Sequence, residues 1–346
     1  MGKSRILIFR CLVALGAVAW LGAADVSAQV NDGKVPPAVA QTKTPVTMLT
    51  DFYVGGAHAP YFAGVGRGIF LDAGLDVKIQ AGKSSLDAAG QVAAGAAQFG
   101  VLDPTASLLA IDKGADLLFV ETYIQKNQAG LCYLKSKTTL SSVDDVAALR
   151  VGATPGDAVF IALKAMLHEK RLNVVTIDPT SYTPALIAGR IDILLCSAAT
   201  FPAREVVVKQ QGQEMGVLYL ADNGLKSLGL VVVVNKTFAK EQPDTVKRFV
   251  QAFARSVVWS IAHPQEAANY VVKAQPDLKP DMVLASFKAL VPFLSVPGRE
   301  WFKMDPEAVQ ATVDLANSAY GIHAAKESFD NQFANGLSAD LRQGRP

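Results

Sequence analysis

The chain has 346 residues, of which half are apolar, and a formal net charge of +2 at pH 7. This length and apolar content are sufficient for a large hydrophobic core and favour two domains over one. Because the net charge is near zero and the sequence has no long charged run, composition gives no indication of binding to nucleic acid or to a membrane surface.

The N-terminus has the pattern of an export signal. Basic residues precede an apolar run at 11–24, and the small residues Ser27 and Ala28 follow it. The apolar run is short for a membrane-spanning helix, although an uncleaved anchor is the alternative. We therefore expect a signal peptide over 1–28 that is cleaved after Ala28, a disordered leader over 29–44, and a periplasmic mature protein.

The first part of the mature chain predicts a βαβ unit. The strand, polar loop, helix and second strand are expected over 46–50, 51–59, 60–73 and 75–79. Pro60 suits the first position of a helix, and Gly74 suits the left-handed position after its end. Parallel strands joined by a helix indicate an α/β fold, in which ligands bind beyond the carboxyl ends of the strands.

The loop after the first strand is therefore a candidate ligand site. Its side chains include an acid, an imidazole and several rings: Asp51, Phe52, Tyr53, His58 and, one turn into the helix, Tyr61. This combination suits a small aromatic or heterocyclic molecule. The alternatives are that the rings belong to the core and that Asp51 only caps the turn.

The rest of the chain alternates strands and helices and is almost wholly helical from residue 237. Strands are expected over 98–102, 117–123, 129–135, 150–153, 174–177, 191–196, 217–220 and 228–234, and helices over 86–94, 104–113, 141–148, 158–168, 184–189, 243–263, 264–274, 280–293 and 306–320. We expect lobe 1 over 45–137 plus 225–335, lobe 2 over 138–224, and a flexible tail over 336–346. Hinges are expected near 136–139 and 223–228, where polar residues would cross between the lobes.

Two cysteines, Cys132 and Cys196, remain once the signal peptide is removed. An exported compartment permits a disulfide between them. Each lies in its own strand-like run, however, so two separately buried thiols are the prediction and a bridge is the alternative. Without a nearby histidine cluster, these cysteines predict no metal site.

Five stretches in fixed order carry a family resemblance. They are HAPYFAGVGRGIFLDAGLDVKI, AAGQVAAGAAQFGVLD, SSVDDVAALRVGATPGDA, PALIAGRIDILL and TFAKEQPDTVKRFVQAFARSVVWSIAHPQEAANYV, and they span most of 46–272. Their combination resembles the exported solute-binding proteins of the type II periplasmic class, in the sulfonate-, nitrate- and thiamine-pyrimidine-binding group (SsuA/THI5-like, NMT1-like). The HAPY stretch with an upstream aspartate is similar to the thiamine-pyrimidine branch.

The resemblance implies two lobes around a ligand cleft, two hinge crossings and closure on the ligand. It also implies a monomer without cofactor that delivers its ligand to a membrane permease with an ATPase subunit. Besides the first loop, the implied ligand contacts are Ser84, Ser85, Asp103 and Thr105 in lobe 1, and Thr154, Gly156, Asp157, Tyr182 and Ser197 in lobe 2. Each lies at a helix N-terminus or at the end of a strand, where free N–H groups face a ligand. Capping is the alternative role for Ser84, Ser85 and Asp103.

The candidate loops favour a neutral or basic heterocycle over an anion. They contain no arginine, and Lys83 is the nearest cation, whereas Asp51, Asp103 and Asp157 can accept hydrogen bonds from amino or ring N–H groups. An aminopyrimidine such as a thiamine precursor is therefore the prediction. A sulfonate, nitrate, an aromatic carboxylate or a flavin-like molecule remains an alternative.

An enzyme is the alternative of a different class. Eukaryotic proteins that resemble this group synthesise the thiamine pyrimidine and carry a cluster of cysteines, which this chain lacks, although His58 falls in the equivalent loop. The sequence has neither a Gly-x-Ser-x-Gly elbow nor a His-Glu-x-x-His pair. We therefore expect no catalytic residues. A receptor that feeds a sensor kinase is a third possibility.

Overall fold

A computed structural model describes residues 43–154, 157–167 and 172–345, which belong to one compact unit of the chain. The predicted signal peptide over 1–28, almost all of the leader and the candidate site residue Gly156 lie outside the described residues. Within those ranges, no helix combines the length and apolar character that crossing a bilayer requires.

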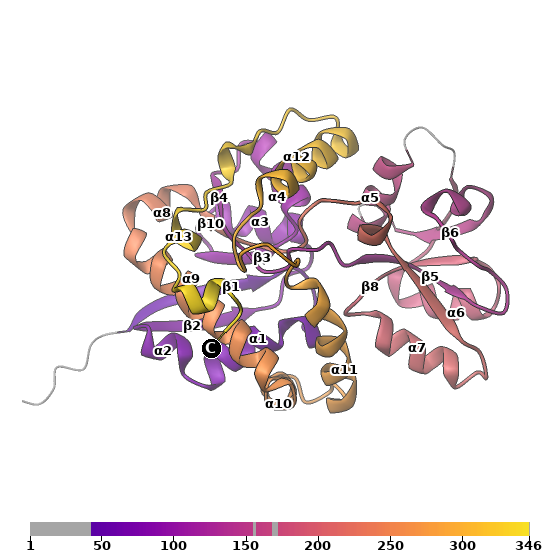
Figure 1. Cartoon of the computed structure of the whole chain (residues 1–346), viewed down its shortest axis with the longest axis horizontal. Helices are drawn as coiled ribbons and strands as arrows, with labels where there is room; N and C mark the ends of the chain where they lie inside the picture. Colours follow the sequence, from indigo (N-terminus) through magenta and orange to yellow (C-terminus); the bar gives the residue numbers. More distant parts are fainter. Residues whose placement is uncertain (1–42, 155–156, 168–171, 346) are drawn as a thin grey trace, which may run out of the picture. The chain divides into compact units, whose positions relative to one another are not determined.

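Lobe 1 is built on a five-stranded mixed sheet with the order β2-β1-β3-β10-β4 (Figure 1). Its strands are β1 (Thr44–Thr50), β2 (Leu75–Gln80), β3 (Phe99–Leu102), β4 (Leu117–Thr122) and β10 (Val231–Asn235). β1 runs parallel to β2 and β3, and β10 runs antiparallel to β3 and β4. The carboxyl ends of β1 and β3 therefore meet at one edge of the sheet, where the loops with Asp51 and Asp103 begin.

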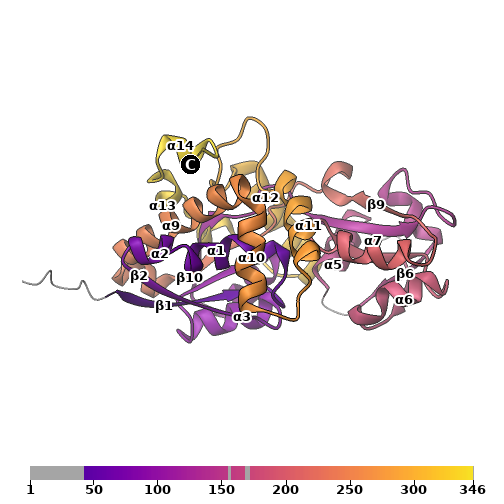
Figure 2. The ribbon, with the colours of Figure 1, turned by 90° about the horizontal axis from the view of Figure 1, so that it is seen from below.

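Helices cover both faces of this sheet. One layer contains α1 (Ala59–Gly66), α2 (Ile69–Asp72), α9 (Pro243–Ala262) and α10 (Pro264–Ala274), and the other contains α3 (Ser85–Ala93), α4 (Pro104–Asp112) and α12 (Pro306–Tyr320). Figure 2 shows α1 beside α9 and α10, and these helices are in contact. Proline at the first or second position begins α4, α9, α10 and α12, as the sequence predicted.

The helix predicted over 60–73 is divided in two. Gly68 has φ 77°, and it ends α1 and begins α2. Glycine adopts this left-handed conformation at no steric cost, so the chain turns there without strain. A periodic pattern of apolar residues continues across such a break, and for this reason the sequence predicted one helix.

Lobe 2 is built on a second five-stranded sheet with the order β7-β6-β8-β5-β9. Its strands are β5 (Ala129–Leu134), β6 (Arg150–Ala153), β7 (Asn173–Thr176), β8 (Ile193–Ser197) and β9 (Met215–Tyr219), and its helices are α5 (Ala158–Met166), α6 (Tyr182–Ile187) and α7 (Phe201–Lys209). The segment predicted as a helix over 141–148 is a 3₁₀ helix over Val143–Ala148. The sequence did not predict α7.

The position of β5 differs from the prediction that lobe 1 extends to residue 137. β5 lies between β8 and β9 and pairs antiparallel with both, so it belongs to the second sheet. The chain therefore passes between the sheets over 123–128 and 220–230. The predicted hinge at 136–139 follows β5 inside lobe 2, whereas the hinge at 223–228 lies in a connecting segment.

The two connecting segments are joined by hydrogen bonds. The Ile124 carbonyl accepts from the Gly229 amide at 2.8 Å, and the Ile124 amide donates to the Leu230 carbonyl at 3.0 Å. The Asn127 side-chain amide donates to the Ser227 hydroxyl and the Leu228 carbonyl, each at 3.1 Å. A hinge motion must therefore bend both segments together.

The remaining helices are α8 (Lys236–Glu241), α11 (Pro280–Leu290), α13 (Gln332–Asn335) and α14 (Ala339–Arg342). The segment 336–346, predicted as a flexible tail, contains α14. Leu337 and Leu341 in this segment are buried in the lobe 1 core, and α14 contacts α9. The segment has too few apolar residues to show a helical period, so the sequence did not predict this packing.

Candidate ligand-binding site

The loop after β1 holds its imidazole and acid in a fixed pair. His58 Nε2 lies 2.9 Å from Asp51 Oδ1, and His58 Nδ1 accepts the Gly55 amide hydrogen at 3.0 Å. Because Nδ1 is an acceptor, Nε2 carries the proton and donates it to the carboxylate. His58 is only 4% exposed, whereas Asp51 is partly exposed. Asp51 therefore presents its carboxylate at the surface with its orientation set by His58.

The rings of this loop divide into two groups. Phe52 and Tyr53 are 45% and 69% exposed, and their centroids are 4.4 Å apart in an edge-on arrangement. Tyr61, in contrast, is fully buried and packs against Tyr123 and Phe253. The structure thus places Tyr61 in the core and leaves the other two rings accessible. Rings that belong to the core are buried, whereas this exposed ring pair provides a surface on which a flat molecule can stack.

The hydroxyl of Tyr61 has no hydrogen-bond partner among the described residues. Burial raises the pKa of this phenol, and the nearby Tyr123 and Asp51 raise it further. Tyr123, in the first connecting segment, donates its own hydroxyl to the Ala57 carbonyl at 2.7 Å. The loop after β1 is therefore tied directly to a segment that joins the two sheets.

The lobe 1 residues at the starts of α3 and α4 form a connected set. Ser84 accepts from the Asp87 amide at 3.2 Å, and Ser85 accepts from the Asp103 amide at 2.9 Å. Asp103 accepts from the Ala106 amide at 2.9 Å and from the Thr105 hydroxyl. Burial raises the pKa of Asp103. Ser84 and Asp103 therefore cap α3 and α4, as their alternative role requires, whereas Ser85 is the first residue of α3 and joins the starts of the two helices.

Tyr320, at the end of α12, is a neighbour of this set that the sequence did not identify. Desolvation, together with the negative charge of Asp103, raises its pKa to about 12, and Thr105 is its hydrogen-bonding neighbour. Tyr320 is more than two hundred positions from Asp103 along the chain. Only the packing of α12 on α4 brings the two together.

The lobe 2 candidates meet around Tyr182. Its hydroxyl lies 3.1 Å from Thr154 Oγ1 and donates to Asp157 Oδ2 at 3.3 Å. Asp157 Oδ1 caps α5 by accepting from two amides, of which Val159 is the nearer at 2.8 Å. Burial is the main cause that raises the pKa of Asp157. Ser197 lies apart from these contacts and exchanges hydrogen bonds with Thr200 at the start of α7.

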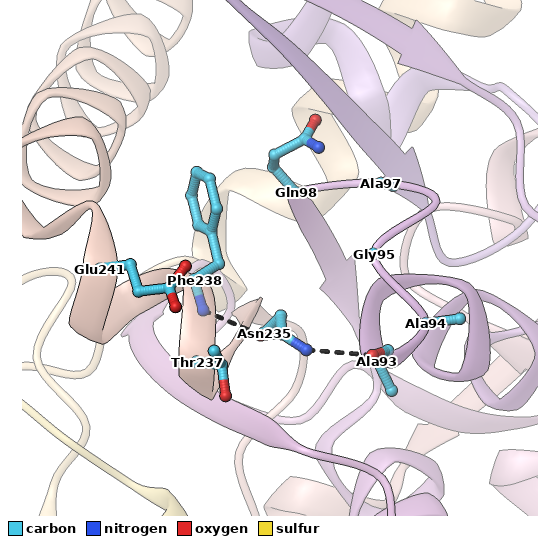
Figure 3. Close-up of a pocket in the computed structure, with 9 residues that line it drawn as sticks. All are labelled: Ala93, Ala94, Gly95, Ala97, Gln98, Asn235, Thr237, Phe238 and Glu241. Atoms are coloured by element: carbon cyan, nitrogen blue, oxygen red, sulfur yellow. Dashed lines mark hydrogen bonds between the residues drawn. The ribbon is translucent and has the colours of Figure 1, made fainter.

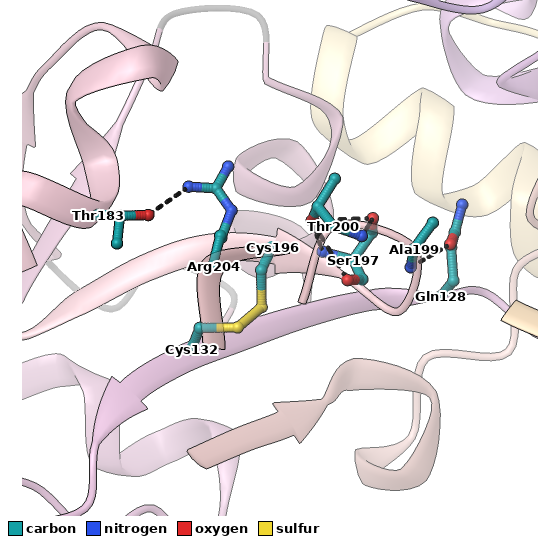
Figure 4. The surroundings of a disulfide bond; sticks show 8 residues. All are labelled: Gln128, Cys132, Thr183, Cys196, Ser197, Ala199, Thr200 and Arg204. Carbon is teal, nitrogen blue, oxygen red and sulfur yellow. Dashed lines mark hydrogen bonds between the residues drawn. A yellow bond between two sulfur atoms is a disulfide. The ribbon is translucent and has the colours of Figure 1, made fainter. Parts of the chain in front are cut away.

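Arg204 on α7 completes this group, and the sequence did not identify it. Its guanidinium carbon lies 5.5 Å from the centroid of the Tyr182 ring. Nη1 donates to Thr183 Oγ1 at 3.3 Å, as Figure 4 shows. The candidate loops contain no arginine, as the sequence indicated, but α7 brings Arg204 beside Tyr182. Because α7 was not predicted, the sequence did not place Arg204 there. Arg204 provides a charged donor that an anionic ligand could use.

The prediction of two separate thiols is also wrong, because Cys132 and Cys196 form a disulfide between β5 and β8 (Figure 4). Their Cα atoms are 6.0 Å apart. The antiparallel register pairs Cys132 with Leu194 and Gly130 with Cys196, so the cysteines occupy diagonal positions on the same face. The strand runs were predicted correctly, but their adjacency was not.

A surface pocket lies away from all of the candidate residues. Its lining, shown in Figure 3, comes from the end of α3, the start of β3 and the region of α8, and includes Gln98, Asn235, Phe238 and Glu241. Gln98 precedes β3, so this pocket lies at the amino end of that strand. The candidate ligand residues lie at the carboxyl ends.

Comparison with known families identifies the chain. The family described as NMT1/THI5 like matches residues 56–267, which is more than half of the chain. The chain belongs to this family. The identification agrees with the resemblance that the HAPY stretch and the four later stretches carry.

The relatives and solved structures that resemble the chain differ in their named activities. The 4-amino-5-hydroxymethyl-2-methylpyrimidine phosphate synthase of Legionella pneumophila is 23% identical over 77% of this chain and 86% of its own length. The riboflavin-binding protein RibY of Chloroflexus aurantiacus is 25% identical over 80% of each chain. The periplasmic aliphatic sulphonate binding protein SsuA of Escherichia coli has a TM-score of 0.64 at 11% identity, over 80% of this chain and 87% of its own. The predicted periplasmic-binding-protein fold is confirmed.

Proposed function

We propose that the mature protein is the extracytoplasmic solute-binding component of an ABC importer and that it binds a small aromatic heterocycle. The exposed Phe52–Tyr53 ring pair beside the oriented Asp51 carboxylate is the observation that carries this proposal. A flat ring stacks on the aromatic pair, and an amino or ring N–H group donates to Asp51. An aminopyrimidine such as a thiamine precursor has both features.

The proposed path begins with export and ends at the membrane. The signal peptide over 1–28 directs the chain to the periplasm, where the monomer binds its ligand and delivers it to a permease with an ATPase subunit. Mass spectrometry of the protein from a periplasmic extract is expected to find Gln29 at the N-terminus. A protein that retains its first 28 residues in the membrane fraction would contradict this localisation.

A thermal-shift screen of the mature chain tests the ligand class. The panel contains aminopyrimidines, thiamine, riboflavin, taurine, alkanesulfonates, nitrate and aromatic carboxylates. A ligand present at one hundred times its dissociation constant adds about 2.7 kcal/mol to the stability of the folded state, which corresponds to a shift of a few degrees. A response only to taurine, nitrate or alkanesulfonates would exclude the heterocycle and leave an anion importer.

The ring pair gives the first prediction on binding. Phe52→Ala and Tyr53→Ala each remove one exposed ring, and each is expected to weaken binding of the heterocycle roughly tenfold, since a ring contact contributes about 1 kcal/mol beyond its buried area. Isothermal titration calorimetry measures the change. Leu71→Ala is the matched control, because Leu71 is 40% exposed in lobe 1 but lies on α2, outside the loop. Equal losses in all three variants would exclude a specific role for the rings.

A conformational change gives a second prediction. Ligand that bridges both lobes is expected to shift the protein to a more compact state, because its contacts with each lobe are made together only when the lobes close. Small-angle scattering with and without saturating ligand measures the radius of gyration. An unchanged radius at saturation would show that the ligand binds one lobe alone.

A synthase is the second candidate, and two observations favour it. Several relatives carry the name of a pyrimidine phosphate synthase, and the buried His58, paired with the partly exposed Asp51, has the geometry of an oriented base. The two functions are distinguished by the mass of the bound ligand after long incubation. An importer component returns only the molecule that was added, whereas a synthase would release an aminopyrimidine phosphate that was not added.

A further inference from the structure

The guanidinium of Arg204 has hydrogen-bonding capacity that the chain does not use. It carries five N–H donors, and the bond to Thr183 occupies one of them. Nε is buried and has no partner among the described residues. No carboxylate in those residues lies at ion-pair distance from Arg204. A buried charged donor without an acceptor costs free energy. A ligand group that accepts hydrogen bonds from Arg204 would offset part of this cost.

The neighbours of Arg204 hold it in position, and Asp157 attracts it electrostatically from beyond ion-pair distance. The Tyr182 ring lies under the guanidinium, and Thr183 fixes one of its terminal nitrogens. Asp157, the nearest acid of the group, is already bonded to two amides and to the Tyr182 hydroxyl. Figure 4 shows the Arg204 side chain extending from α7 away from the disulfide and toward Thr183. An arginine so placed presents a fixed fork of donors.

We propose that Arg204 is the residue that recognises an oxyanion group on the ligand: a carboxylate, sulfonate or phosphate. The terminal N–H groups that Thr183 leaves unoccupied bind two oxygens of this group side by side. The inference rests on the proposed function and narrows its ligand to a flat heterocycle with an acidic substituent. Asp51 in lobe 1 then contacts the ring N–H groups, and Arg204 in lobe 2 contacts the acid.

Matched pairs of probes test this role. The pairs are pyridine-3-carboxylate with pyridine-3-methanol, and hydroxymethyl-aminopyrimidine with its phosphate monoester. The wild-type protein is expected to bind the acidic member roughly ten to a hundred times more tightly than its neutral partner, since a charge-assisted hydrogen bond to arginine is about twice as strong as a neutral one. Arg204→Gln is expected to remove this preference, measured by calorimetry, and Arg204→Lys to restore part of it.

Lys209→Gln is the matched control, because it removes one positive charge from the same helix at an exposed position paired with Glu205. It is expected to keep the preference for the acidic member. If Lys209→Gln and Arg204→Gln reduce the preference equally, a general effect of charge replaces the proposal. If wild type binds the neutral member as tightly as the acid, the Arg204 proposal is wrong while the proposed function stands.

Nitrogen-15 NMR of arginine side chains provides a second test. It does not depend on the matched probe pairs or on the stability of the variants. Titration of the wild-type protein with inorganic sulfate, phosphate and benzoate is expected to shift the Arg204 Nε–H signal, assigned by its absence in Arg204→Lys. A shift without binding of any heterocycle would support the oxyanion site and contradict the proposed ligand class. No shift with any of the three anions would overturn the oxyanion site.

Discussion

Replacing Glu121 with methionine is expected to stabilise the protein by about 1–3 kcal/mol at pH 7, because the glutamate is a buried group whose polar atoms have no partners. Glu121 lies in β4, it is fully buried, and neither carboxyl oxygen has a hydrogen-bond partner among the described residues. It pairs with Val232 beside an irregularity in the ladder between β4 and β10. Methionine has a similar length without the polar atoms.

The same carboxyl predicts how stability depends on pH. Burial raises the pKa of Glu121 well above its ordinary value of 4.5. The folded state therefore holds this proton at pH values where the unfolded state has released it, so the group costs progressively more stability as the pH rises above about 4.5, up to its folded pKa. The wild-type protein is expected to lose stability over this range relative to Glu121→Met.

Urea unfolding followed by tryptophan fluorescence measures both effects. Trp301 is a suitable reporter, since its neighbour Phe302 accepts the Thr122 amide hydrogen next to Glu121 at 2.9 Å. Glu300→Met is a control that removes a carboxylate from a partly exposed position in the same region. A Glu121→Met protein that is less stable than wild type at pH 7 would show that the carboxylate has a partner outside the described residues or a role in packing.

Breaking the disulfide is expected to destabilise lobe 2 by about 4 kcal/mol, because the unfolded chain gains the entropy that the cross-link withholds over a sequence separation of 64 residues. Cys132 and Cys196 are both buried, and the bond joins β5 to β8, the strand that ends at Ser197 shortly before α7. Cys132→Ala/Cys196→Ala is expected to lose amide protection first in β5 and β8, as hydrogen exchange would measure.

Thiol counting provides the control for this prediction. The mature chain from Gln29 contains no other cysteine, so the denatured protein is expected to show two free thiols only after reduction. The double alanine variant is expected to unfold at the same urea concentration with and without reductant. Two reactive thiols in the unreduced wild-type protein would mean that the bond does not form, and the stability difference between oxidised and reduced protein would then vanish.

Local features of the fold were predictable from the sequence because their causes lie within a few residues. Asp103 and Asp157 each precede a helix and accept its first amide hydrogens, as their positions before α4 and α5 indicated. The strand, loop and helix around Asp51 were predicted for the same reason, since alternation and helical period are read from neighbours in the chain.

The sequence by itself determined the α/β class, the caps and the loop that carries Asp51, Phe52, Tyr53 and His58. The tertiary structure alone decided the pairing of β5 with β8, and this ladder in turn decided the disulfide and the boundary of lobe 2. It also placed Arg204 beside Tyr182, Tyr320 beside Thr105 and Tyr61 in the core. The physical reason is common to these cases. Local propensity depends on adjacent residues, whereas strand partners, burial and the meeting of charges depend on surfaces that come together only when the chain has folded.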